Sequence, residues 1–165
     1  MSKIGLDSRS YKKIRIQDLK RLGVIASKDM ADFFLNHPEY KVFRGRVICI
    51  ALCQGAAQHY KDGTTGINDF DVYTFFKKHS NISWYAKRIK SYDFGKPRFG
   101  QSQDKPDFIG RRVDCMGREI EMNESEGAIS ALRRYLKKGK TKTARLLAEK
   151  AVVLISPKCG SIVWP

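Results

Sequence analysis

The segment GINDFDVYTFFKK, residues 66–78, places two aspartates, Asp69 and Asp71, at the start of a run rich in apolar and aromatic residues. Aromatic and β-branched residues favour strands, so the run predicts a β-strand over residues 70–78. Side chains two positions apart in a strand point to the same face, where two carboxylates repel each other. We therefore expect a metal ion, an arginine or solvating water beside Asp69 and Asp71.

The segments on either side of this strand predict the rest of a small sheet. RVICIALCQG, residues 46–55, is a continuous apolar run that ends at a glycine, which is typical of a strand buried on both faces. A helix is expected to start just after it, at Ala56. FIGRRVDCMGREIEM, residues 108–122, predicts a third strand or a hairpin that turns at Gly117. Residues 83–107 are rich in aromatic, basic and turn residues, which predicts part helix and part loop.

Apolar residues at helical spacing dominate both ends of the chain. Residues 16–40 predict one or two short helices that end before Pro38. Residues 124–156 predict two further helices separated by Gly139. The expected fold class is therefore α+β, with a small mixed β-sheet, helices packed against it and a C-terminal helical pair. We expect a single domain over 1–165, with the sheet core in 42–122 and the C-terminal helices in 124–156.

The charge balance points to a polyanionic partner. The 165 residues include 32 Lys and Arg against 17 Asp and Glu, a formal net charge of +15. Such an excess favours nucleic acid as the partner, although a solvated basic surface without a partner also accounts for it. Two segments concentrate the positive charge, and their candidate nucleic-acid-binding residues are Lys87, Arg88, Lys90, Arg133, Arg134, Lys137 and Lys138.

Aromatic residues interleave with the first basic segment, which suggests a platform where unpaired bases stack. The alternative is that these aromatics, Trp84 and Phe99 among them, belong to the core. No stretch reaches the roughly 18 apolar residues of a membrane-spanning helix, so no membrane association is expected. The N-terminal residues lack the apolar centre of a secretory signal, and the four cysteines form no CxxC pair, so a cytoplasmic location is expected.

A third acidic residue completes a family pattern. Asp114 lies in the predicted third strand between Val113 and Cys115. The series CIALCQGAAQHY, GINDFDVYTFF and RRVDCMG resembles the nucleotidyltransferase-fold superfamily, which includes polymerase β-type enzymes and poly(A) polymerases. That family has a strand, Gly-Ser or Gly-Gly at a helix start, an Asp-x-Asp or Asp-x-Glu on the next strand, and a further acidic residue on a later strand. The resemblance covers residues 46–120, less than half of the chain.

The resemblance implies a metal-dependent nucleotide transfer from an NTP to a nucleic acid, with RNA the expected acceptor. Asp69, Asp71 and Asp114 would be the catalytic and metal-binding residues, holding two Mg²⁺ ions or Mn²⁺, and Asp114 would also help to draw the proton from the acceptor hydroxyl. Gly55 would let the backbone approach the triphosphate. The family's next residue, Ser or Gly, is Ala56 here, so Gln54, Gln58 or Thr65 would have to replace the missing hydroxyl. The implied nucleotide-binding residues are Gly55, Ala56, Gln58 and Thr65.

Other interpretations remain open on the sequence. The same fold could be a catalytically inactive nucleic-acid-binding protein. A metal-dependent nuclease is a weaker alternative, because the lysine that restriction-type nucleases carry two residues after the second acid is missing from both DVYTFF and EIEMNE. Each acid also has an ordinary structural interpretation: Asp69 as a turn cap, Asp71 paired with a lysine such as Lys77, and Asp114 paired with Arg111 or Arg112.

Overall fold

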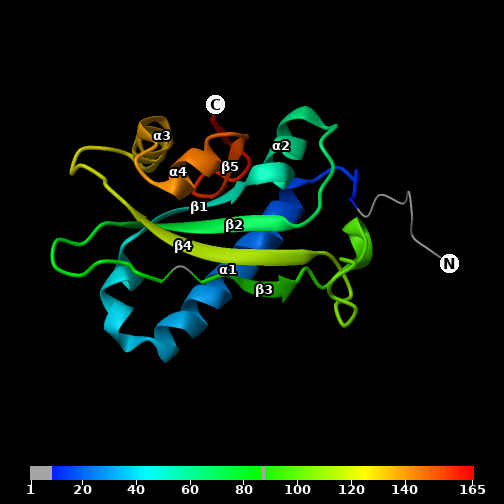
Figure 1. Cartoon of the computed structure of the whole chain (residues 1–165), viewed down its shortest axis with the longest axis horizontal. Helices are drawn as coiled ribbons and strands as arrows, with labels where there is room; N and C mark the ends of the chain where they lie inside the picture. The colour runs from blue at the N-terminus through cyan, green and yellow to red at the C-terminus, as the bar shows by residue number, and fades with distance from the viewer. Residues whose placement is uncertain (1–8, 87) are drawn as a thin grey trace.

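The computed structural model describes residues 9–86 and 88–165, whose strands form one six-stranded sheet in the order β3-β4-β2-β1-β5-β6 (Figure 1). Neighbouring strands are antiparallel except for β2 and β4, which run parallel. The α+β prediction is confirmed. The strands are β1 (Val47–Cys53), β2 (Phe70–Lys77), β3 (Lys90–Asp93), β4 (Arg112–Ile120), β5 (Val152–Ser156) and β6 (Ile162–Trp164).

Helices cover both faces of the sheet. Helix α1 (Ile16–Asn36) passes behind β2 and β4 in Figure 1, and its Leu19 and Leu22 pack with Val72 of β2. Helices α3 (Ala128–Lys138) and α4 (Lys142–Leu147) cover the opposite face, where Leu132 packs with Tyr73. Because β1 lies inside the sheet, alternate residues of its apolar run enter the two cores, as the continuous run predicted.

Short helical segments make the remaining connections. Helix α2 (Gln54–Asp62) links β1 to β2 and ends at Gly63, whose φ of 72° is the left-handed conformation that favours glycine. The 3₁₀ helix η1 (Pro38–Gly45) follows α1, and a second one, η2 (Pro97–Phe99), follows β3. Residues 16–36 form one long helix. The helix predicted within residues 83–107 is absent from the described part of that segment, which contains strand β3 and the one-turn η2.

Strand β4 continues straight through Gly117, so the structure has the single strand and not the hairpin. The indole of Trp84 lies against this glycine and donates a hydrogen bond of 3.1 Å from Nε1 to the Gly117 carbonyl. A Cβ placed on Gly117 would come within 2.8 Å of the Trp84 ring, closer than real contacts. Gly117 is therefore needed for close packing and not for a turn.

The Gly117→Ala substitution is expected to lower the free energy of unfolding by about 1–3 kcal/mol, because the added methyl group overpacks the Trp84 site. Urea denaturation of the purified protein measures the change. Gly45→Ala is the matched control, since a Cβ at Gly45 meets nothing within 4 Å. Equal stability of the two variants would contradict the packing role given to Gly117.

The predicted C-terminal helical pair is wrong in its second half. Helix α4 ends at Leu147, and residues 152–156 and 162–164 form β5 and β6. The apolar run VVLIS is rich in β-branched residues, and it pairs with β1, with Ala51 opposite Leu154. The sheet consequently extends beyond the predicted 42–122 core to Trp164.

Candidate metal centre and basic surface

The parallel pairing of β2 with β4 assembles the three predicted acids. In this register Asp71 lies directly opposite Asp114, and Asp69 comes two residues before Asp71 on the same side of the strand. One carboxylate oxygen from each residue lies within 4.8 Å of the others. Asp69, Asp71 and Asp114 therefore form one cluster, as the sequence predicted, although the first and last of them are 45 positions apart. This cluster is called the acidic triad below.

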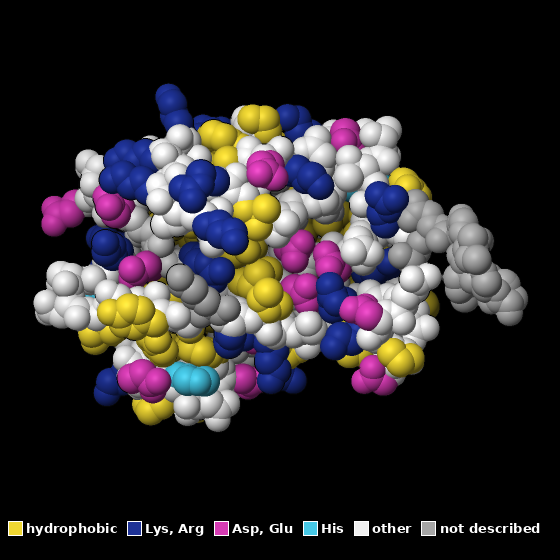
Figure 2. Space-filling model, in the orientation of Figure 1, with side chains coloured by type: hydrophobic (Ala, Val, Ile, Leu, Met, Phe, Trp, Pro, Cys, Tyr) yellow, Lys and Arg dark blue, Asp and Glu magenta, His cyan; other side chains and the backbone are white. Residues whose placement is uncertain are grey.

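The acidic triad lies on the face of the sheet that α3 and α4 also cover, because Asp71 and Tyr73 alternate to the same side. Acidic side chains gather near the middle of the face drawn in Figure 2, over the first residues of β2 and β4, and basic side chains border them. Asp114 is only 7 % exposed, whereas Asp69 and Asp71 are half-buried. Oxygens of the triad are thus open to a small cation from this face.

The acidic triad carries more negative charge than its surroundings neutralise. Burial, together with the neighbouring charges of Asp69 and Asp114, raises the pKa of Asp71 to about 8. Burial also raises the pKa of Asp114, against the opposing effects of a hydrogen bond from Ser91 and the charge of Arg112. Crowded carboxylates of this kind are stabilised by binding a proton or a cation.

Arg112 supplies one positive charge to the cluster. Its Nη2 donates to Asp69 at 2.5 Å, and its Nε lies 3.2 Å from an Asp114 oxygen. Its Nη1 also pairs with Asp104. Arg112 precedes Asp114 by two residues on β4, so the strand itself turns both side chains to the same face. The ordinary interpretation of Asp114 as an arginine partner is correct to this extent, but Asp71 has no such ion pair among the described residues.

Sequence reasoning missed Ser91, which belongs to the acidic triad's surroundings. Its hydroxyl donates a hydrogen bond of 2.7 Å to Asp114 Oδ1, and β3 pairs with β4 so that Ser91 lies opposite Asp114. This bond holds the carboxylate in one orientation. The sequence contains little that would indicate this role for Ser91, since β3 has only four residues and its register depends on pairing with β4.

The turn from β1 into α2 lies beside the acidic triad, because the last residue of β1, Cys53, pairs with Asp71. Gln54 then starts the helix with a φ of 61°, a left-handed conformation that is uncommon for a residue with a side chain. A Cβ on Gly55 would lie 3.8 Å from the Gly66 carbonyl oxygen, an ordinary contact. The fold itself therefore has room for a side chain at Gly55.

The other predicted nucleotide-binding residues have structural contacts of their own. Ala56 is buried in the core with α1. The Gln58 side chain accepts a hydrogen bond of 2.9 Å from the Ala151 amide, which ties α2 to the start of β5. The Thr65 hydroxyl donates to Asp62 at 2.7 Å. Gln58 and Thr65 therefore already have partners within the protein.

Arg88, in the first basic segment, has a structural role. Arg88 pairs with the buried Asp29 at 2.9 Å and lies over the Phe33 ring, 4.6 Å from its centre. Trp84 and Phe99 are buried, so the core interpretation of these aromatics is confirmed. Lys90 is exposed on β3, and Lys87 lies outside the described residues.

The second basic segment is more open to solvent. Arg133 donates to the Val163 carbonyl, whereas Arg134 is held by Glu126 at 2.5 Å. Lys137 and Lys138, in the last turn of α3, are exposed. Of the two predicted nucleic-acid-binding segments, this one thus offers the more accessible charge.

Comparisons with known proteins found no matching family model and no significantly similar curated protein or solved structure. Among residues 9–86 and 88–165, no helix combines the length and apolar composition needed to cross a membrane.

Proposed function

We propose that this chain is a metal-dependent nucleotidyltransferase-like protein that transfers a nucleotide from an NTP to a nucleic-acid acceptor, with RNA the expected acceptor. The observation that carries the proposal is the acidic triad, whose three carboxylates approach within 4.8 Å. The order of the elements also supports it: a strand, a glycine at a helix start, an Asp-x-Asp strand and a paired strand bearing the third acid. This order matches the family pattern that the sequence resembles.

The donor set of the acidic triad fits Mg²⁺ or Mn²⁺. Both are hard cations that favour carboxylate oxygens and retain bound water, so three protein carboxylates suffice. Asp69 and Asp71 would hold both of two ions, with Asp114 a ligand of one. Bound there, such ions neutralise the charge that develops on a transferring phosphoryl group and on the attacking and leaving oxygens.

The protein's own groups would position the reactants. Ser91 fixes the orientation of Asp114, which would also accept the proton of the acceptor hydroxyl. The start of α2 lies beside Asp71, and its free backbone amides favour the negative charge of a triphosphate. The room at Gly55 would let those phosphates come close to the backbone. Catalysis would then consist mainly of positioning and charge neutralisation.

The test incubates the purified protein with each labelled NTP in turn, total RNA and either Mg²⁺ or Mn²⁺. The expected result is label transferred to RNA by at least one NTP and lost on addition of EDTA. The proposal fails if no NTP gives transfer with either cation while the protein remains folded.

One observation favours the inactive nucleic-acid-binding alternative. Arg112 already contacts Asp69 and Asp114, so it neutralises part of the charge that a metal would otherwise neutralise. In that alternative Arg112 is the permanent cation of the acidic triad. In the catalytic proposal Arg112 competes with the metal and moves aside or shares the carboxylates.

The two cases differ in the effect of Arg112→Gln on Mn²⁺ binding. If the arginine competes, removing its charge is expected to tighten Mn²⁺ binding about tenfold, or about 1.4 kcal/mol, because a positive charge no longer repels the ion. Electron paramagnetic resonance of free Mn²⁺ during a titration measures the affinity. Arg133→Gln makes the same charge change on α3 and should leave it unaltered. Unchanged or weaker binding by Arg112→Gln would favour the inactive alternative.

A further inference from the structure

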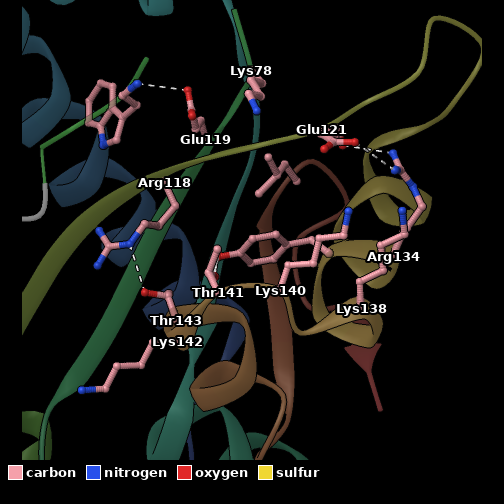
Figure 3. Close-up of a pocket in the computed structure, with 13 residues that line it drawn as sticks. Lys78, Arg118, Glu119, Glu121, Arg134, Lys138, Lys140, Thr141, Lys142 and Thr143 are labelled. Atoms are coloured by element: carbon pink, nitrogen blue, oxygen red, sulfur yellow. Dashed lines mark hydrogen bonds and ion pairs between the residues drawn. The ribbon is translucent and has the colours of Figure 1, made fainter.

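A cavity of about 510 Å³ opens between the end of β4 and the α3–α4 junction (Figure 3). It is called the junction pocket below. Its wall includes the apolar or aromatic residues Trp84, Ile120 and Tyr135. The charged residues that line it are Lys78, Arg118, Glu119, Glu121, Arg134, Lys138, Lys140 and Lys142. Six positive side chains therefore oppose two negative ones.

The two acids of the junction pocket are already engaged. Glu119 accepts a hydrogen bond of 3.0 Å from the Trp84 amide, and Glu121 lies 3.8 Å from Arg134. Four lysines line the pocket as well, and no ion pair recorded for the described residues involves any of them; they are Lys78, Lys138, Lys140 and Lys142. The pocket consequently presents unneutralised positive charge around an apolar wall.

Two side chains of the junction pocket are held in place by hydrogen bonds. Arg118 donates from Nη1 to the Gly117 carbonyl at 2.7 Å. It also donates from Nε to the Thr143 hydroxyl at 3.3 Å (Figure 3). Tyr135 shares a hydrogen bond of 3.3 Å with Thr141, so its ring is fixed between α3 and the junction. A fixed guanidinium and a fixed aromatic ring bind a planar, phosphate-bearing ligand with little loss of side-chain freedom.

The position of the pocket relates it to the acidic triad. Asp114 and Arg118 are four residues apart on β4, so their side chains point to the same face of the sheet. At about 3.3 Å per residue they are separated by about 13 Å, which about four stacked nucleotides at about 3.4 Å each would span. A strand that ends at the triad can thus reach the pocket along β4.

We infer that the junction pocket binds an unpaired segment of the nucleic-acid acceptor, with the lysines and Arg118 contacting phosphates and Tyr135 contacting a base. Positive charge next to an aromatic ring that lines a pocket, here the half-buried Tyr135, is the combination that single strands require, whereas a duplex offers no free base face. The description of this strand as the acceptor rests on the proposed function. The binding itself does not, because it needs neither a metal nor an NTP.

Fluorescence anisotropy of a short labelled single-stranded RNA, measured without divalent ions or NTP, tests the inference. The variant Lys140→Glu/Lys142→Glu reverses two charges at the pocket, and Lys78→Glu/Lys138→Glu reverses two others, just after β2 and at the end of α3. Lys28→Glu/Lys41→Glu is the matched control, since these exposed lysines lie on α1 and η1. Circular dichroism verifies that each variant is folded.

Each pocket variant is expected to bind the RNA at least about tenfold more weakly than the wild type, whereas the control changes the affinity by less than about threefold. The slope of log affinity against log salt should fall by about 1.4 in magnitude, 0.7 for each lost phosphate contact. A duplex of the same sequence is expected to bind more weakly than the single strand.

Three results would overturn the inference: equal losses in pocket and control variants, no binding of single-stranded RNA by the wild type, or equal affinity for the duplex. A failed transfer assay with a selective loss of binding in the pocket variants would refute the proposed function and leave the pocket assignment standing. Successful transfer together with equal losses of RNA affinity in the pocket and control variants would support the proposed function and refute the pocket assignment.

Discussion

Asp71→Asn is expected to lower the rate of nucleotide transfer at least about a hundredfold, which corresponds to about 2.7 kcal/mol of transition-state stabilisation. The amide is nearly the same size as the carboxylate but removes the charge that would hold the metal between Asp69 and Asp114. Asp114→Asn is expected to have an effect of similar size, because it removes both a ligand and the proton acceptor. Single-turnover transfer of a labelled NTP to RNA measures these rates.

A loss of folding would not explain this result. The three carboxylates repel one another, so replacing Asp71 with a neutral amide is expected to maintain or raise the free energy of unfolding. Asp32→Asn, an exposed position on α1, removes the same charge elsewhere and should transfer at the wild-type rate. Transfer by Asp71→Asn at more than about a tenth of the wild-type rate would rule out the acidic triad as the catalytic centre.

Arg88→Ala is expected to lower the free energy of unfolding by about 3 kcal/mol, because it breaks a buried ion pair. Removing the guanidinium leaves the carboxylate of Asp29, only 1 % exposed, without this ion-pair partner. The hydrogen bond of 2.6 Å from Tyr92 would remain. The contact of Arg88 with the Phe33 ring is lost as well. Urea denaturation monitored by tryptophan fluorescence measures the change.

Lys137→Ala provides the contrast for Arg88, since this exposed residue of α3 should alter stability by no more than about 0.5 kcal/mol. The comparison also decides between two roles for Arg88. If Arg88→Ala proved as stable as Lys137→Ala but bound RNA weakly, Arg88 would be a nucleic-acid contact and its pairing with Asp29 would contribute little.

Much of the central sheet was predictable because its signals are local. The apolar run before Gly55 and the run after Asp69 each carry enough strand-forming residues to predict β1 and β2 to within about two residues. The C-terminal third misled the prediction, because residues 141–156 show apolar residues at helical spacing. Residues 152–156 join the sheet because they form hydrogen bonds with the edge of β1 that β2 does not occupy, with Leu154 opposite Ala51.

The candidate site was predictable in its acids and not in their surroundings. The proximity of Asp69, Asp71 and Asp114 could be predicted, because the two strands that carry them and the family resemblance were enough to place them side by side. The hydroxyl of Ser91 depended on the register of a four-residue strand, which no local pattern determines.

By itself, the sequence determined the three central strands, β1, β2 and β4, and the charges that this protein carries, since strand-forming runs and composition are properties of the chain alone. Only the tertiary structure decided how those charges are used. Arg112 pairs with two members of the acidic triad, Arg88 neutralises a buried aspartate, and the lysines around the α3–α4 junction have no ion pair within residues 9–86 and 88–165. These outcomes depend on contacts between residues far apart in sequence, and the energy of a charge depends on the neighbours that folding brings to it.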